Sequence, residues 1–269
     1  MEKQELKKRS EVPVELTWDL EVLFATRAEY ETALTKMEAD VAEFAETFTG
    51  ALNNAEVIVE AIKAYEAIQT QVSVLYHYAN LPAATDLTNA DYTQMAGQFD
   101  NKMATVSATL SFFDSELTQV PEEILDAVVE SEPLYASFIR HTKADKHIQL
   151  TPEVEKALAQ LSPTLYAPES IYDQAKLADM DFGTFTVDGE DYPLSFVLYE
   201  DFYMYHTDTA IRRAAFDAFS KVLKQYENVI AQAYYSKVQT EKTLATMRGF
   251  DSIFDYLLYN QEVDQDLYN

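Results

Sequence analysis

Three long stretches with the apolar periodicity of α-helices, joined by short connections, constrain this chain more than any other feature. Apolar residues recur in them every three or four positions, which aligns them along one stripe of each helix. The stripes are Tyr30, Leu34, Met37, Val41, Phe44 and Phe48; Val57, Ala61, Tyr65, Ile68, Val72, Leu75 and Ala79; and Tyr92, Met95, Phe99, Met103, Val106, Leu110, Phe113 and Leu117. Because an apolar stripe must be buried, we expect the first two helices to pack antiparallel and the third to complete a three-helix arm.

Local signals indicate where these helices begin and end. Thr26 and Glu29 have the spacing of a capping box, and Gly50 ends the first helix. Asn53 is the expected cap of the second helix. Leu81-Pro82 is its expected end, because proline lacks an N–H donor and clashes with the preceding turn.

The middle of the chain consists of shorter helices. Pro121 and Thr151-Pro152 each open a helix with glutamate in its first turn, where negative charge is favourable. Ser162-Pro163 and Ala167-Pro168 are expected to bracket a turn-rich link.

One segment departs from the helical pattern. Apolar residues alternate on either side of Asp188-Gly189, a dipeptide that favours a tight hairpin turn. We predict a two-stranded ribbon over residues 182–194. Because an isolated hairpin is marginal in water, the ribbon must lie against helices or pair with another strand.

The chain returns to helix after Ser195. A long helix is predicted over 208–247, with Arg248-Gly249 as its stop signal. Asp251 is the expected cap of a short helix, and Asp264 begins a further helix of barely one turn. A helix that short is marginal, so we expect the chain to stop inside a domain, with a frayed tail as the alternative.

The predicted fold is therefore all-α, with one short β-hairpin. Its expected domains are a long-helix arm (1–120), a helical small domain ending in the hairpin (121–194), and the first helices of an incomplete domain (195–269).

Composition excludes several classes of partner. The formal net charge of -26 argues against a basic surface for nucleic acid or anionic membrane. No run of apolar residues is long enough to span a membrane, and Met1–Ser10 has no apolar signal-peptide core. The chain has no cysteine, which suits a reducing compartment. We expect a cytoplasmic protein.

Histidine spacing bears on metal chemistry. His-Glu-x-x-His, the helical zinc motif of many peptidases, does not occur among the four histidines: His77, His141, His147 and His206. Glu200, Asp201 and His206-Thr207-Asp208 could be read as metal ligands, but their spacing fits no common zinc pattern. A helix junction capped by Asp208 is the preferred interpretation.

Other candidates also have ordinary structural explanations. His141 and His147 are expected to be surface groups. Four tyrosines crowd one region, where they could form an aromatic wall for peptide side chains or simply pack in a core: Tyr192, Tyr199, Tyr203 and Tyr205. The acidic clusters at Glu122-Glu123 and Asp179–Asp181 are expected to be solvated helix ends.

An ordered set of short segments resembles the oligoendopeptidase F family. The segments are Thr17–Leu20, Phe185–Glu190, Pro193–Ser195, Ile211–Phe216 with Asn228 after them, and Lys242–Ser252. The resemblance implies a cytosolic, mostly helical zinc metallopeptidase that hydrolyses short peptides inside a deep channel. In that family, His-Glu-x-x-His supplies two zinc ligands and the general base, a later glutamate completes the metal site, and downstream histidine or tyrosine donors stabilise the oxyanion.

All of these family groups lie beyond the last residue of this chain, so the resemblance assigns no catalytic, metal or substrate-binding residue here. It implies the N-terminal portion of the peptidase, which shapes the channel entrance, is inactive alone and binds no zinc itself. The implied partners are short peptides and a missing C-terminal catalytic half. The alternative is a complete, non-catalytic helical protein for peptide binding or regulation. If the chain is such a truncated portion, the apolar faces after Ser195 lack their partners and are expected to promote self-association.

Overall fold

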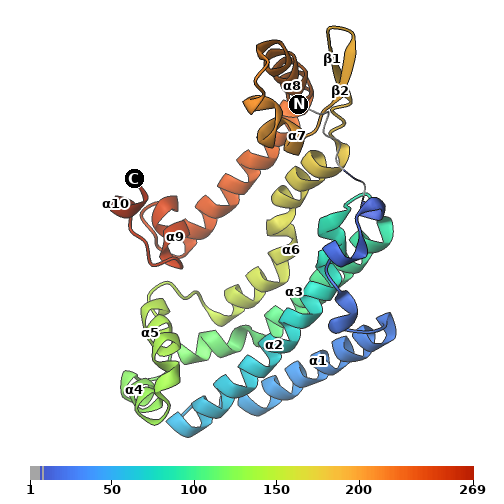
Figure 1. Cartoon of the computed structure of the whole chain (residues 1–269). Helices are drawn as coiled ribbons and strands as arrows, with labels where there is room; N and C mark the ends of the chain where they lie inside the picture. The colour runs from blue at the N-terminus through green and yellow to red at the C-terminus, as the bar shows by residue number, and fades with distance from the viewer. Residues whose placement is uncertain (1–6, 8) are drawn as a thin grey trace. The chain divides into compact units, whose positions relative to one another are not determined.

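A computed structural model describes residue 7 and residues 9–269. The prediction for Met1–Ser10 falls mostly on residues 1–6 and 8, which lie outside the described residues. Across the described part, helices dominate, and the strands form one two-stranded antiparallel sheet (Figure 1). The prediction of a mostly helical fold is confirmed. No described helix combines the length and apolar character required to cross a membrane.

The chain divides into two compact units, each built from separate segments. We call them the hairpin unit and the arm unit. The hairpin unit contains the residues up to Trp18, Ala84–Ala90 and Ala167–Val238; the arm unit contains Asp19–Ala83, Asp91–Tyr166 and Gln239–Asn269. The predicted domains (1–120, 121–194 and 195–269) follow chain order instead, and that division remains a prediction.

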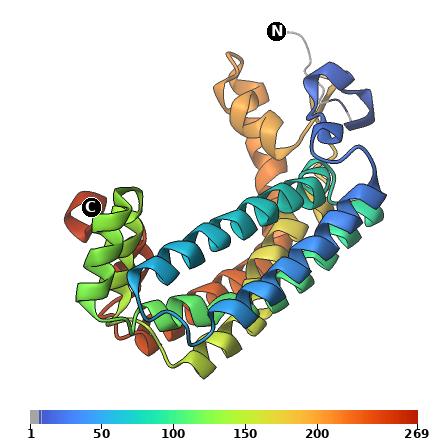
Figure 2. The same ribbon diagram turned by 90° about the horizontal axis from the view of Figure 1, so that it is seen from below.

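The arm unit is centred on three long helices, α1 (Arg27–Phe48), α2 (Ala55–Thr85) and α3 (Ala90–Leu117), which lie side by side (Figure 2). Ring contacts fix their directions. Tyr30 stacks on Tyr78 with centroids 4.9 Å apart, and Phe44 meets Tyr65 at 6.0 Å, so α1 and α2 run antiparallel as predicted.

Phe113 of α3 completes the centre of this core, where it is fully buried. Its ring lies 5.3 Å from Phe44 and 4.9 Å from Tyr65. Two shorter helices, α4 (Glu122–Ser131) and α5 (Ala136–Asp145), add their apolar faces to the same core. Apart from Tyr92, the residues of the predicted stripes therefore belong to one continuous core.

The first helix boundary follows the sequence, whereas two features of the second differ from prediction. Thr26 caps α1 by accepting a hydrogen bond from the Glu29 N–H. Asn54 rather than Asn53 caps α2, because its side chain accepts from the Val57 N–H. α2 does not end at Leu81-Pro82 but continues through Pro82 to Thr85. Proline removes one hydrogen bond there, and a single lost bond so near the end leaves the last turn intact.

The prediction of a turn-rich link between Ser162-Pro163 and Ala167-Pro168 is wrong. One helix, α6 (Pro152–Gln174), continues through both prolines and leads into a π-helical turn at Ala175–Asp179. Each proline frees the carbonyl four residues before it. α6 has no buried side chain, so water can reach the freed carbonyls, and the rest of the helical ladder holds the helix together.

The hairpin unit contains the predicted ribbon. β1 (Thr184–Val187) and β2 (Glu190–Pro193) pair in register through a turn at Asp188 and Gly189. Both turn residues have positive φ, at 53° and 82°, which explains the Asp-Gly pair. As expected, the ribbon packs against helices. The buried residues of this core are Phe182, Phe185, Leu194, Leu198, Tyr203, Ile211, Ala215 and Phe219.

The helices after the ribbon match the prediction except at one cap. They are α7 (Phe196–Asp201), α8 (Thr209–Met247), α9 (Ile253–Tyr259) and α10 (Gln265–Tyr268). Gly249 ends α8 with φ 81°. Ser252 rather than Asp251 caps α9, since its hydroxyl accepts from the Asp255 N–H. Short 3₁₀ turns lie at Arg9–Glu11, Val14–Leu16, Leu20–Val22, Pro133–Tyr135 and Tyr203–Tyr205.

Candidate functional site

The acidic and histidine residues around His206 form a helix junction. His206 is buried, and its Nδ1 accepts a hydrogen bond from the Asp208 N–H. Asp208 in turn accepts from the Ala210 N–H at the start of α8. Across residues 7 and 9–269, no three His, Asp or Glu side chains are grouped to hold a metal ion. The described donor set therefore does not fit a zinc ion.

The other two predicted histidine positions are exposed and separate. His141 lies 3.5 Å from the carboxylate of Glu262, which also pairs with Arg140. His147 is exposed beside the ring of Tyr259. Among the described residues, neither histidine belongs to a group of three side chains that could hold a metal ion.

The four tyrosines have different environments. Tyr203 is fully buried in the hairpin unit, where it meets Phe185 edge-on at 4.9 Å. Tyr192 and Tyr199 are half-buried at the edge of the same core, whereas Tyr205 is 73% exposed. Packing accounts for three of the four positions, and the substrate-wall interpretation remains untested.

The acidic clusters lie at helix ends. Glu122 and Glu123 are exposed in the first turn of α4. Asp181 accepts a hydrogen bond from the Gly183 N–H just before the ribbon, and both it and Asp179 are exposed.

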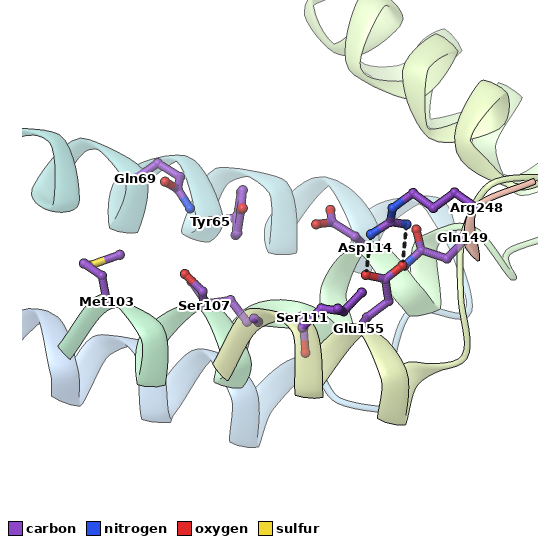
Figure 3. A pocket seen from close by; sticks show the side chains of 12 residues that line it. Tyr65, Gln69, Met103, Ser107, Ser111, Asp114, Gln149, Glu155 and Arg248 are labelled. Atoms are coloured by element: carbon purple, nitrogen blue, oxygen red, sulfur yellow. Dashed lines mark hydrogen bonds and ion pairs between the residues drawn. The ribbon is translucent and has the colours of Figure 1, made fainter. Parts of the chain in front are cut away.

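A polar pocket in the arm unit was not predicted from the sequence. We call it the arm pocket. It has a volume of about 460 Å³, within the usual range for small-molecule sites (Figure 3). Its lining comes from α2, α3, the loop before α6, α6 itself and the end of α8: Tyr65, Gln69, Met103, Ser107, Leu110, Ser111, Asp114, Gln149, Glu155, Leu158, Ala159 and Arg248.

One wall of the arm pocket is a charge pair between α6 and the residue after α8. Arg248 donates from Nη1 and Nη2 to the two carboxylate oxygens of Glu155, at 2.7 and 2.9 Å. Arg248 also donates to the Ile148 carbonyl, and Glu155 accepts from the Leu150 N–H. Desolvation would raise the pKa of Glu155, but the hydrogen bonds from Arg248 and Leu150 outweigh it and lower that pKa.

Asp114 is the unpaired charge of the arm pocket. Its side chain makes no hydrogen bond or ion pair with the part of the chain that the structure describes. Surrounding protein atoms desolvate the carboxyl, and the charges of Asp145 and Glu155 repel its anion, which together raise the pKa of Asp114 to about 6. The side chain nevertheless has a solvent-exposed surface inside the pocket.

The sequence contains only a weak signal for this pocket. Ser107, Ser111 and Asp114 recur at helical spacing on α3, beside the apolar stripe. Gln149, Glu155 and Arg248 are distant in sequence, and no local spacing connects them to α3. The arrangement can bind a ligand through a carboxylate, hydroxyls and amides around an apolar floor.

Comparison with known proteins gives a consistent result along the chain. A family model described as Oligopeptidase F matches residues 116–182. An oligoendopeptidase F homolog from Borreliella burgdorferi is 28% identical over 263 residues, which is 97% of this chain and 43% of that protein. The plasmid oligoendopeptidase F of Lactococcus lactis subsp. cremoris is 24% identical over 268 residues, 98% of this chain and 44% of its own length.

The chain is similar to oligoendopeptidase F proteins along nearly its whole length. The resemblance noted in the sequence is thus confirmed. The crystal structure of oligoendopeptidase-F from Enterococcus faecium shares the fold, with a TM-score of 0.81 and 23% identity over 90% of this chain and 49% of that one. A putative peptidase from Chlamydophila abortus aligns with a TM-score of 0.59 and 21% identity over 98% of this chain and 45% of that one. The chain therefore spans less than half the length of these relatives.

Proposed function

We propose that this chain is the N-terminal part of an oligoendopeptidase F-like zinc metallopeptidase that hydrolyses short peptides in an enclosed channel. Its role is to shape the channel entrance, and it is inactive alone. The observation that carries the proposal is the match of 97% of this chain to 43% of a relative, in a sequence without His-Glu-x-x-His. The proposed partners are short peptides and a C-terminal catalytic half.

The zinc of the proposed enzyme is held by polypeptide other than the described residues. Their donors do not group around a metal position, so no step of peptide hydrolysis is assigned to them. The absence of cysteine and the family relationship support a cytoplasmic location for the whole protein.

Peptide hydrolysis by the purified chain tests the proposal. A quenched fluorescent peptide is incubated with the chain, with added zinc and with a chelator, beside a complete lactococcal oligoendopeptidase F as the positive control. We expect cleavage by the control only. Zinc-dependent, chelator-sensitive cleavage by this chain would refute the assignment of the metal site to other polypeptide.

Two further measurements distinguish the proposal from a non-catalytic binding protein. Reading the coding sequence past Asn269 should give a continuation that contains His-Glu-x-x-His. An immediate stop codon, together with saturable binding of an uncleaved labelled peptide measured by fluorescence anisotropy, would favour the binding or regulatory alternative.

A further inference from the structure

We propose that the arm pocket binds a small ligand that carries one ammonium group on an apolar stem, with the Asp114 carboxylate as its counter-ion. All of the lining residues belong to the arm unit.

The charge of the arm pocket indicates the charge of the ligand. Arg248 is the one cation among the lining residues, and its guanidinium is bound to both oxygens of Glu155. That pair is neutral overall. Asp114 remains as a single negative charge that no described side chain neutralises. A monocation would supply the partner that the carboxylate lacks.

The rest of the lining indicates the shape of the ligand. Ser107, Ser111 and the two glutamines provide oxygens that can accept from an ammonium group, which has three N–H donors. Apolar surface surrounds them and suits a short hydrocarbon or aromatic stem: Tyr65, Met103, Leu110, Leu158 and Ala159.

Other ligand classes fit less well. An anion would face the negative charges of Asp114, Asp145 and Glu155, while the charge of Arg248 is already balanced by the Glu155 carboxylate. A divalent metal ion prefers several oxygen ligands, carboxylates above all, and the described residues place no three His, Asp or Glu side chains together. A neutral ligand would displace water from the Asp114 carboxylate without supplying an opposite charge.

The ionisation of Asp114 supports the same assignment. The titratable and charged groups that face its carboxyl are Asp145, Glu155, Arg248 and Tyr65. Because its pKa is about 6 in the free protein, an ammonium ligand must compete with a proton at lower pH. We expect affinity to rise with pH through about 6 and then level off, since the amine stays protonated throughout this range.

Methyl-labelled methionine NMR provides a local test, because Met103 lines the arm pocket. The probe is phenethylamine, and phenethyl alcohol is its neutral isostere. We expect the chemical shift of the Met103 methyl group to change saturably as the amine is added, with a dissociation constant on the order of millimolar. The alcohol should bind about tenfold more weakly, or worse, because it cannot form the charge-assisted bond.

Three variants separate specific binding from general attraction to an acidic protein. Asp114→Asn keeps the side-chain shape and should weaken amine binding about tenfold. Asp217→Asn makes the same charge change at an exposed position on α8 and should leave binding unchanged. Ser107→Phe leaves Asp114 in place but fills the pocket, and should abolish the Met103 response.

A second comparison of ligands identifies the source of the ammonium group. A leucyl dipeptide amide is compared with its N-acetylated form. If the free dipeptide amide binds at least as tightly as phenethylamine and the N-acetylated form does not bind, the site is assigned to a peptide N-terminus. If the free dipeptide amide binds more weakly than phenethylamine, the site is assigned to small free amines. Equal affinities in Asp114→Asn and Asp217→Asn, equal binding of amine and alcohol, or no saturable response would each overturn the proposal.

Discussion

Substitutions in the Glu155–Arg248 ion pair test how much this pair stabilises the arm unit. It joins α6 to the residue that follows α8, across 93 positions of sequence. The side chains are 12% and 20% exposed, so the pair is largely shielded from water. We consider Glu155→Gln, Arg248→Met and the double variant.

The expected loss in the free energy of unfolding depends on which charged group remains unpaired after each substitution. Two unit charges about 4 Å apart attract by about 4 kcal/mol at the effective dielectric of a protein surface region. Arg248→Met leaves a desolvated Glu155 carboxylate with the Leu150 N–H, so we expect a loss of about 3–4 kcal/mol. Glu155→Gln retains an amide oxygen for Arg248 and should cost less, about 2 kcal/mol. The double variant leaves no buried charge, so the coupling energy should be about 2 kcal/mol.

Urea denaturation followed by far-ultraviolet circular dichroism measures these differences, since urea, unlike guanidinium, does not screen the pair. Because the pKa of Glu155 is lowered on folding, its contribution is present above its usual value of 4.5 and is lost as the pH falls below it. The difference in the free energy of unfolding between the wild type and Glu155→Gln should therefore decrease at acidic pH. Additive single effects, within about 0.5 kcal/mol, would show that the two side chains do not stabilise each other.

Three other perturbations test separate parts of the structure. Asp114→Asn should stabilise the chain by about 1 kcal/mol at neutral pH, because the full shift in pKa corresponds to about 3 kcal/mol and exposure of the carboxyl to solvent reduces it. The gain should develop between pH 3.8 and about 6 in urea titrations, and a constant difference across that range would contradict it. Tyr203→Phe should be neutral or stabilising by about 1 kcal/mol, since the buried hydroxyl has no hydrogen-bond partner among the described residues; a clear loss of stability on thermal denaturation would contradict this. Phe216, Tyr234 and Phe254 are exposed apolar residues after Ser195, so light scattering should detect self-association, and a compact monomer without dye-binding surface would refute it.

Local chemistry made much of the fold predictable. Thr26 caps its helix through a hydrogen bond to a residue three positions away, and Asp188-Gly189 forms its turn through its own backbone preference. The apolar stripes were equally readable, because helical periodicity alone determines which residues share a face. Phe44 and Phe113 were placed on two of these stripes, and both are buried in the core, where their rings meet.

The errors arose where the surroundings of a residue decide the outcome. Pro163 and Pro168 were interpreted as helix breakers, but the helix around them is long and accessible to water, so the missing donors are tolerated. Asn53 and Asn54 are adjacent candidates for the N-cap of α2, and only the Asn54 side chain accepts a hydrogen bond from the Val57 N–H. Sequence spacing cannot distinguish cap residues that are one position apart. The arm pocket depends on residues from distant segments, which no local pattern relates.

The segment Lys242–Ser252, which helped to identify the family, also has a structural role in this chain. Gly249 ends α8 in a left-handed conformation, and the preceding Arg248 binds Glu155. Part of this segment thus forms one wall of the arm pocket. Because Arg248 also removes the Glu155 charge as a competitor for a cation, Arg248→Met would leave two negative charges in the pocket. The pair therefore determines both the stability of the arm unit and the single charge on which ligand selection depends.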